Sequence, residues 1–299
     1  MKRGIWSWLG WGSVICVLLL RDAQGVKNIP PDMVKIPAGW FIMGSDIGPE
    51  DAQPAHRVYL ATYFIDKYEV TNAQYKKYRD ERLAERKKGK EVRMALPYCE
   101  VNAPPEARQL WNITDGTYPL AYANHPVTCL PWDAANEYCK GIGKELPTEA
   151  QWEKAARGAN GLAYPWGNEW EPSYNNHGFA HAPWEDASDG YGRTAPVGSL
   201  PKDVSPYGVY DMGGNVWEWT RDIYSKSYYK WAPTRNPPGP TLKTLPVKEL
   251  SIARDHLQYV HKGGSWVSGP EKSLSYFRFP RPIVYRDDAG GFRCVKELK

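Results

Sequence analysis

Short apolar runs broken by turn residues dominate the hydrophobic pattern of this chain. The segment Met33 to Gly44 contains two such runs on either side of Pro37-Ala38-Gly39, a pattern that predicts a hairpin of two strands. A further run, His125 to Trp132, predicts a core strand that leads into a helix. Long stretches with helix or strand periodicity are few, whereas Pro, Gly, Trp and Tyr are abundant. The pattern therefore predicts one loop-rich domain held by aromatic packing.

Polar capping signals mark the predicted helices. Thr71 with Gln74, and Thr148 with Gln151, have the capping-box spacing, in which each side chain accepts a hydrogen bond from the partner's backbone N–H. Gly141-Ile142-Gly143 is a stop signal. The predicted helices run from about Asn72 to Arg82, from Asp133 to Lys140, and from Thr148 to about Arg157.

The segment 79–124 differs in composition from its surroundings. It is charged at first and then rich in Pro, Asn and Tyr, so we interpret it as an insertion within a domain that spans residues 33–299. The net charge is only +4, and much of the basic excess lies between Arg79 and Arg93. A solvated helical insertion explains this segment better than a nucleic-acid-binding patch, so we expect no nucleic-acid partner.

Residues 1–25 have the pattern of a signal peptide. Met1-Lys2-Arg3 precedes an apolar run from Ile5 to Leu20, and Ala23-Gln24-Gly25 supplies small residues at the spacing that a signal peptidase accepts. The alternative is an uncleaved anchor, but the run is short for a membrane span, which needs roughly 20 apolar residues. We expect an exported protein, periplasmic or secreted, or in the endoplasmic reticulum lumen or outside the cell in a eukaryote, with no membrane span after cleavage.

Four cysteines follow this leader: Cys99, Cys129, Cys139 and Cys294. An even number in an oxidising compartment favours disulfides. Four cysteines allow three pairings, and the sequence alone does not choose among them.

Seven short motifs then occur in one order between residue 33 and the C-terminus, and together they resemble the signature of the formylglycine-generating enzyme, or sulfatase-modifying factor, family. The resemblance implies a compact α+β domain of low regular secondary structure, related to the C-type lectin fold. The motifs are Pro37-Ala38-Gly39 with Met43-Gly44, Glu69-Val70-Thr71-Asn72, Leu146-Pro147-Thr148-Glu149, Tyr164-Pro165-Trp166-Gly167, Gly214 to Trp219, Gly263-Gly264-Ser265-Trp266 and Gly291-Phe292-Arg293-Cys294.

The redox site that the resemblance implies lacks its cysteines. Members that make formylglycine resemble oxidases that bind copper(I) between two cysteines, and these two positions fall on Ser268 and Ser273. A serine hydroxyl is a hard, weak ligand and has no redox-active sulfur. No cysteine lies between Cys139 and Cys294, so no shift of the alignment restores the pair. We therefore expect neither bound copper nor formylglycine synthesis, and the sequence leaves the catalytic residues unassigned.

The resemblance implies further site residues. It pairs Cys139 with Cys294 in a disulfide, which leaves Cys99 and Cys129 for a second disulfide or, alternatively, a metal site. It also implies a pocket lined by Trp217, Trp219 and Trp266, with Ser265 as a further candidate, although the tryptophans fit a core position equally well.

Two calcium loops complete the implied site. Calcium takes six to eight oxygen ligands, and loops rich in acids and amides supply them. In the second loop, Asn175 and Asp186 are alternative ligands, and Asx-turns without metal are the alternative for both loops. The first ligand set is Asp211, the carbonyls of Gly214 and Val216, and Glu218; the second is Asn176, the carbonyl of His177, Asp189 and the carbonyl of Tyr191.

Two functional hypotheses follow from a retained scaffold with an emptied redox site. The first is a calcium-stabilised accessory, maturation or binding protein whose groove binds a protein, a peptide or a small molecule. The alternative is an oxidoreductase of the formylglycine-generating and non-haem iron superfamily with a different active site. Whether the protein is an enzyme stays open at this stage, because fold alone does not settle function.

Overall fold

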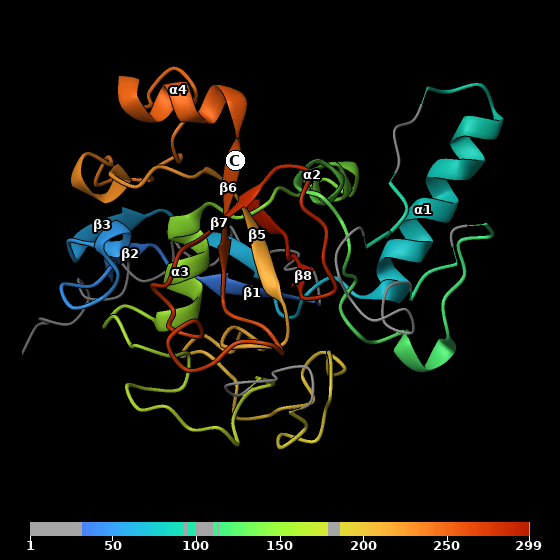
Figure 1. Cartoon of the computed structure of the whole chain (residues 1–299), viewed down its shortest axis with the longest axis horizontal. Coiled ribbons are helices and arrows are strands. Elements are labelled where there is room, and N and C mark those ends of the chain that lie inside the picture. The colour runs from blue at the N-terminus through green and yellow to red at the C-terminus, as the bar shows by residue number, and fades with distance from the viewer. Residues whose placement is uncertain (1–31, 92–94, 100–109, 113, 179–185, 299) are drawn as a thin grey trace, which may run out of the picture. The chain divides into compact units, whose positions relative to one another are not determined.

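The computed structural model describes residues 32–91, 95–99, 110–112, 114–178 and 186–298, and the predicted leader at 1–25 lies outside them. From Asp32 onward the chain forms one compact α+β unit with few helices and strands and long loops. Figure 1 shows the loops between α3 and β5 gathered on one side of the sheets. The predicted loop-rich α+β fold is confirmed.

The described strands form three small sheets. The first has the order β1-β4-β9, the second pairs β2 with β3, and the third has the order β7-β6-β5-β8, in which only the β5–β8 pair is parallel. The strands are β1 (Met33–Ile36), β2 (Gly39–Met43), β3 (His56–Leu60), β4 (Tyr63–Asp66), β5 (Trp217–Ile223), β6 (Gln258–Lys262), β7 (Phe279–Pro282), β8 (Gly290–Gly291) and β9 (Val295–Glu297).

The helices are α1 (Asn72–Lys87), α2 (Trp132–Gly141), α3 (Glu149–Arg157) and α4 (Val247–Asp255), and single 3-10 turns occupy Glu50–Ala52, Leu120–Tyr122 and Tyr228–Lys230. Both predicted capping boxes form, at Thr71 with Gln74 and at Thr148 with Gln151. No helix in the described part of the chain combines the length and apolar character needed to cross a membrane.

Two strand predictions were wrong. The runs around Pro37-Ala38-Gly39 do form strands, but β1 pairs with β4 and β2 with β3, so the turn carries the chain from one sheet to another. The segment His125 to Trp132 is no named strand and makes only an isolated bridge between Thr71 and Pro126. Pro126 and Pro131 have no backbone N–H to donate to a neighbouring strand, and Cys129 adopts the left-handed region with φ 62°.

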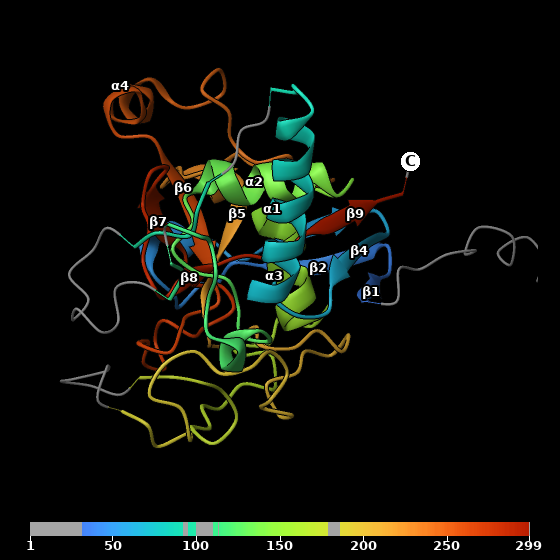
Figure 2. The ribbon, with the colours of Figure 1, turned by 90° about the vertical axis from the view of Figure 1, so that its right-hand side faces the viewer.

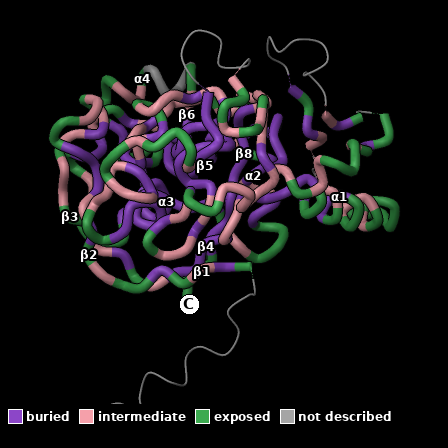
Figure 3. Tube along the Cα trace, turned by 90° about the horizontal axis from the view of Figure 1, so that it is seen from below, coloured by how far each residue is buried: buried purple, intermediate pink, exposed green. Residues whose placement is uncertain are grey.

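Helix α1 is longer than predicted, because it continues past Arg82 to Lys87. Leu83 and Ala84 are strong helix formers, and the guanidinium of Arg82 pairs with Glu85 at 2.9 Å across one turn. Only the first turns of α1 are buried. Figure 2 shows α1 on the face of the molecule toward the viewer, and Figure 3 shows its remainder exposed at one side of the core. This exposure agrees with the predicted solvated helix.

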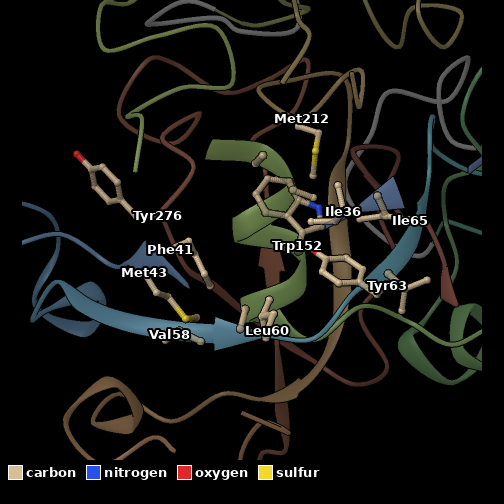
Figure 4. Packing of buried hydrophobic residues seen from close by; sticks show 14 of the residues in the cluster. Ile36, Phe41, Met43, Val58, Leu60, Tyr63, Ile65, Trp152, Met212 and Tyr276 are labelled. Carbon is tan, nitrogen blue, oxygen red and sulfur yellow. The ribbon is translucent and has the colours of Figure 1, made fainter. Parts of the chain in front are cut away.

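The core forms around α3, all nine residues of which are buried. Figure 4 shows Trp152 of α3 directed between Met212 and the side chains of Ile36 and Tyr63. Ile36 belongs to β1 and Tyr63 to β4, which are neighbours in the first sheet. A second cluster packs α2 against Trp219 of β5 and the C-terminal Phe292. The motif-bearing loops are therefore anchored on both sides by packed aromatic side chains.

Candidate functional site

Two of the motifs meet at the end of the β5–β6 pair. Trp266 N–H donates to the carbonyl of Asn215 at 2.9 Å, which joins the Gly-Gly-Ser-Trp turn to the Gly-Asn-Val-Trp segment. Gly264 has φ 76°, and a Cβ there would lie 2.9 Å from Ser273 Oγ. Only glycine fits this close approach without strain. The turn consequently places Ser273 against Gly264, the residue before Ser265.

The three hydroxyls occupy a buried turn. Ser265, Ser268 and Ser273 are each at most 1% exposed. The oxygens Ser265 Oγ and Ser268 Oγ lie 3.1 Å apart, and Ser265 N–H donates to Ser268 Oγ at 3.0 Å. Ser273 Oγ has no hydrogen-bond partner among the described residues. These hydroxyls are neutral, hard donors, whereas a soft metal prefers thiolates. The described residues hold no group of three or more His, Cys, Asp or Glu side chains that could hold a metal ion.

A pocket of about 130 Å³ opens beside this turn. Of the predicted pocket residues, Trp266 lines it, whereas Ser265 does not and Trp217 packs its ring 4.6 Å from that of Phe279 in a small aromatic cluster. The pocket lining mixes apolar, hydroxyl and charged groups: Leu110, Tyr122, Pro126, Thr128, Cys129, Arg193, Thr194, Trp266 and Asp288.

In the predicted calcium loop, the described residues on either side of 179–185 enclose one carboxylate. The Oδ2 oxygen of Asp189 accepts a hydrogen bond from His177 N–H at 2.8 Å, and its Oδ1 oxygen accepts one from Tyr191 N–H at 2.8 Å. Burial raises the pKa of Asp189 above its usual value. Asn176 Oδ1 is buried, and none of the described residues hydrogen-bonds to it. A buried amide oxygen without a described partner and a buried carboxylate are ligand types that suit a hard, oxygen-liganded cation such as calcium.

The loop at 211–218 lies against the first one but fits calcium less well. Asn215 N–H donates to the carbonyl of Asn176 at 2.9 Å, so the two loops touch. However, both oxygens of Glu218 accept from Arg293, each at 2.7 Å, and Trp152 Nε1 also donates to one of them at 2.9 Å. A guanidinium therefore already neutralises this carboxylate.

Asp211, the other acid of this loop, lies in a cluster of buried carboxyl groups. Its Oδ2 oxygen accepts from Gly198 N–H at 2.6 Å. Burial raises its pKa to about 6, and burial together with the charge of Asp211 raises the pKa of Glu69 well above the usual value. Glu69 Oε2 has no hydrogen-bond partner among the described residues. Asp211 thus lies among buried acids that include Glu69 and Glu218, and the charge of Glu218 also raises its pKa.

The two disulfides match the expected pairs. Cys139 of α2 is bonded to Cys294, and Cys99 is bonded to Cys129. The first bridge is completely buried between Tyr138 and Phe292, whereas Cys129 borders the pocket.

A buried ionic network positions the serine turn from beneath. Glu153 of α3 accepts from Lys262 Nζ at 3.0 Å, and Lys262 immediately precedes Gly263. Glu149, one turn earlier, accepts two hydrogen bonds from Arg278 at 2.7 and 3.0 Å. Lys262 precedes the serine turn and Arg278 follows it, so the two glutamates of α3 hold both ends of the turn.

Several of these residues escaped the sequence reasoning. Arg293 was part of a recognised motif, but its pairing with Glu218 bridges 75 positions. Glu69 and Asp203 join the buried acids around Asp211, although burial of a carboxylate leaves no mark in local periodicity. The one sequence signal for a buried ion pair was a charged residue between apolar neighbours, such as Arg293 in Gly-Phe-Arg-Cys.

Comparison with known proteins gives a consistent result. The model of the family described as "Sulfatase-modifying factor enzyme 1-like domain" matches residues 21–298. The chain is 34% identical to the formylglycine-generating enzyme of Mus musculus, over 89% of this chain and 75% of that protein. It is also 34% identical to the mouse protein named inactive C-alpha-formylglycine-generating enzyme 2, over 89% of this chain and 85% of that protein.

A solved structure agrees with these sequence relatives. PvdO from Pseudomonas aeruginosa superposes with a TM-score of 0.64 at 27% identity and covers 89% of this chain and 94% of its own. The motif order, the α+β architecture and the extent of these matches all lead to one assignment. The chain belongs to the sulfatase-modifying factor enzyme 1-like family.

Proposed function

We propose that this protein is an exported, calcium-stabilised accessory or binding protein of its family and that it does not make formylglycine. The observation that carries the proposal is the turn at 263–273, where buried, neutral Ser268 and Ser273 stand at the positions of the family's copper-binding cysteines. Without thiolates, the turn has neither a soft-metal ligand nor a redox-active sulfur.

The relatives support the view that the family's fold can be kept in a protein that does not carry out its reaction. The chain is as similar to a protein named as inactive as it is to one named as the enzyme. A scaffold of this kind retains its loops and pocket while its reaction is lost. The pocket bordered by Trp266, with the paired charges of Arg193 and Asp288, is the proposed ligand-binding site for a peptide, protein or small molecule.

Elemental analysis of the mature protein, purified without added metal, tests the redox part of the proposal. Copper and iron should be absent, and a copper(I) titration should show no stoichiometric binding. The Ser268→Cys/Ser273→Cys double variant provides the matched comparison, and bound copper in that variant alone would attribute the difference to the two sulfurs. One equivalent of copper in the unaltered protein would refute the proposal.

Calcium dependence tests the structural part. We place calcium at Asn176 and Asp189, so excess calcium should stabilise the protein by about 2.7 kcal/mol at 100 times the dissociation constant. Thermal unfolding in calcium and in a chelator measures the difference, which Asp189→Asn should abolish. Asp80→Asn, in the exposed part of α1, is the control that should keep it. Identical unfolding curves in calcium and chelator would contradict this placement.

A further inference from the structure

We propose that the Cys99–Cys129 disulfide is a thiol–disulfide exchange site that accepts a cysteine-containing peptide, or another thiol, from the pocket bordered by Trp266. The inference rests on the proposed function in one respect, because the same pocket must admit a ligand. It adds a reactive group and a substrate class to that pocket. It needs neither calcium nor the serine turn.

The two disulfides of the protein differ in access. Cys139 and Cys294 are both 0% exposed and lie within the aromatic cluster that includes Tyr138 and Phe292. Cys129 is also largely buried within the fold, but it forms part of the wall of the pocket. Exchange requires a thiolate to reach a disulfide sulfur, so the Cys99–Cys129 bridge, which borders a pocket, is the more accessible of the two.

The surroundings of Cys129 favour an anionic sulfur. Thr128 Oγ1 lies 3.6 Å from Cys129 Sγ and is able to donate to a thiolate. Arg193 lines the same pocket, 2.9 Å from Asp288 and with its guanidinium 5.3 Å from the centre of the Trp266 ring. The hydroxyl can stabilise a thiolate at Cys129, Arg193 adds a cation to the same pocket, and the indole offers an apolar wall for a peptide.

The backbone at Cys129 is also unusual. Its φ of 62° lies in the left-handed region, which a non-glycine residue seldom adopts. The conformation is held because Cys129 N–H donates to the Asp287 carbonyl at 2.9 Å and the Cys129 carbonyl accepts from Tyr98 N–H at 3.1 Å. Residues kept in such conformations by their surroundings concentrate at functional sites. Cys139, by contrast, lies within regular helix α2.

The exchange balances without a bound cofactor. A substrate thiolate attacks Cys129 Sγ, a new sulfur–sulfur bond forms, and the Cys99–Cys129 bond breaks with its electron pair leaving on Cys99, which takes up a proton. A second substrate thiol then displaces Cys129 in the same way. Two substrate thiols are oxidised to one disulfide while the protein bridge is reduced to two thiols. A disulfide of the glutathione class re-forms the bridge by the reverse sequence.

Glutathione serves as the probe. The mature oxidised protein is incubated with reduced glutathione, sampled over time, alkylated and mapped by mass spectrometry. Cys99 and Cys129 should become alkylated at least about tenfold faster than Cys139 and Cys294, since exchange rates follow access. Equal rates for the two bridges, or faster reduction of Cys139–Cys294, would overturn the proposal.

Single-cysteine variants identify the attacked sulfur. Cys99→Ser leaves a thiol at Cys129 in the pocket and should form a mixed disulfide with oxidised glutathione faster than Cys129→Ser does. Arg193→Gln should slow that reaction in the Cys99→Ser background, and Arg193→Lys should largely restore it because the charge returns. Far-ultraviolet circular dichroism confirms that each variant is folded. A Cys129→Ser protein that reacts as fast as Cys99→Ser would also refute the assignment.

S-methylglutathione, which cannot exchange, separates the two proposals. If it binds the oxidised protein while reduced glutathione attacks both bridges equally, the exchange site is refuted and a ligand-binding pocket remains. If copper is found in the unaltered protein while Cys99–Cys129 exchanges selectively, the proposed function is refuted and the exchange site stands.

Discussion

Glu153 is a buried carboxylate that two cations share. Its oxygens accept from Lys262 at 3.0 Å and Arg157 at 2.9 Å, and also from Gly44 N–H at 2.7 Å. Burial alone would raise its pKa, but Lys262 and Arg157 outweigh burial and lower the pKa to about 2. This depressed value means that Glu153 stabilises the fold fully above the unfolded pKa near ~4.3, and that this contribution disappears as the pH falls toward 2.

Replacing Glu153 by glutamine should therefore be severe. The Glu153→Gln change leaves buried Arg157 without its carboxylate and leaves Lys262 with only the longer contact to Glu149 at 3.7 Å, so we expect a loss of about 3–5 kcal/mol in the free energy of unfolding by urea. Glu145→Gln is the matched control, because Glu145 pairs with Arg221 at the surface and should contribute less than about 1 kcal/mol. Equal losses in the two variants would show that Glu153 is not held as a buried ion.

Asp222 has the opposite pH behaviour. Burial and the neighbouring Glu149 raise its pKa to about 7, despite the nearby Arg221 and Arg278 and a hydrogen bond from Glu149 N–H at 2.8 Å. Tyr228 also faces this group. A raised pKa means that the protonated form stabilises the fold below about pH 4, and that this contribution is lost as the pH rises to about 7.

The Asp222→Asn variant tests this sign. Asparagine keeps an oxygen for Glu149 N–H but cannot ionise. The variant should therefore not lose this contribution to stability as the pH rises. Between pH 5 and pH 8, the free energy of unfolding of the unaltered protein should fall by about 2 kcal/mol more than that of the variant. Urea titrations of both proteins at the two pH values measure the difference. Parallel pH profiles would rule out a raised pKa at Asp222.

At the scale of the element, the capping box of α3 is a local device in a buried setting. Thr148 Oγ1 accepts from Gln151 N–H at 3.0 Å, and Gln151 Oε1 accepts from Thr148 N–H at 2.8 Å. Removing the hydroxyl with Thr148→Ala should cost about 1 kcal/mol in the free energy of unfolding, and Thr148→Ser should cost far less. Chemical denaturation of the two variants gives the comparison. A serine variant as unstable as the alanine variant would attribute the loss to the methyl group.

The elements differ in how well the sequence predicted them. The capping boxes of α1 and α3 were identified correctly because all their partners lie within three residues. The end of α1 was missed because Lys87 carries no sharp stop before Gly89. Strand partners were missed altogether at β1, whose partner β4 is about 30 positions away.

At the scale of the whole molecule, the two disulfides close loops of very different length. Cys139 and Cys294 are separated by 155 positions, and Cys99 and Cys129 by 30. A longer closed loop removes more entropy from the unfolded chain, so Cys139→Ala/Cys294→Ala should lose about 4–5 kcal/mol in the free energy of unfolding. The Cys99→Ala/Cys129→Ala protein should lose about 1–2 kcal/mol less. Guanidinium unfolding ranks the variants, and the reverse order would contradict the loop-length argument.

The sequence by itself determined the family, the starts of α1 and α3, and the absence of a cysteine pair at Ser268 and Ser273. These features are local, because a cap, a glycine turn or a missing sulfur depends on residues within a few positions. They were sufficient to predict the loop-rich α+β domain, since motif order specifies connectivity.

Only the tertiary structure decided how the site is arranged. It paired Glu218 with Arg293, and it buried Asn176 Oδ1 without a described partner while two backbone N–H groups enclose Asp189. It also exposed one disulfide, at Cys129, to a pocket. These outcomes depend on which side chains meet across tens to hundreds of positions. Burial and charge pairing determine which of these long-range contacts form, and no local sequence pattern predicts them.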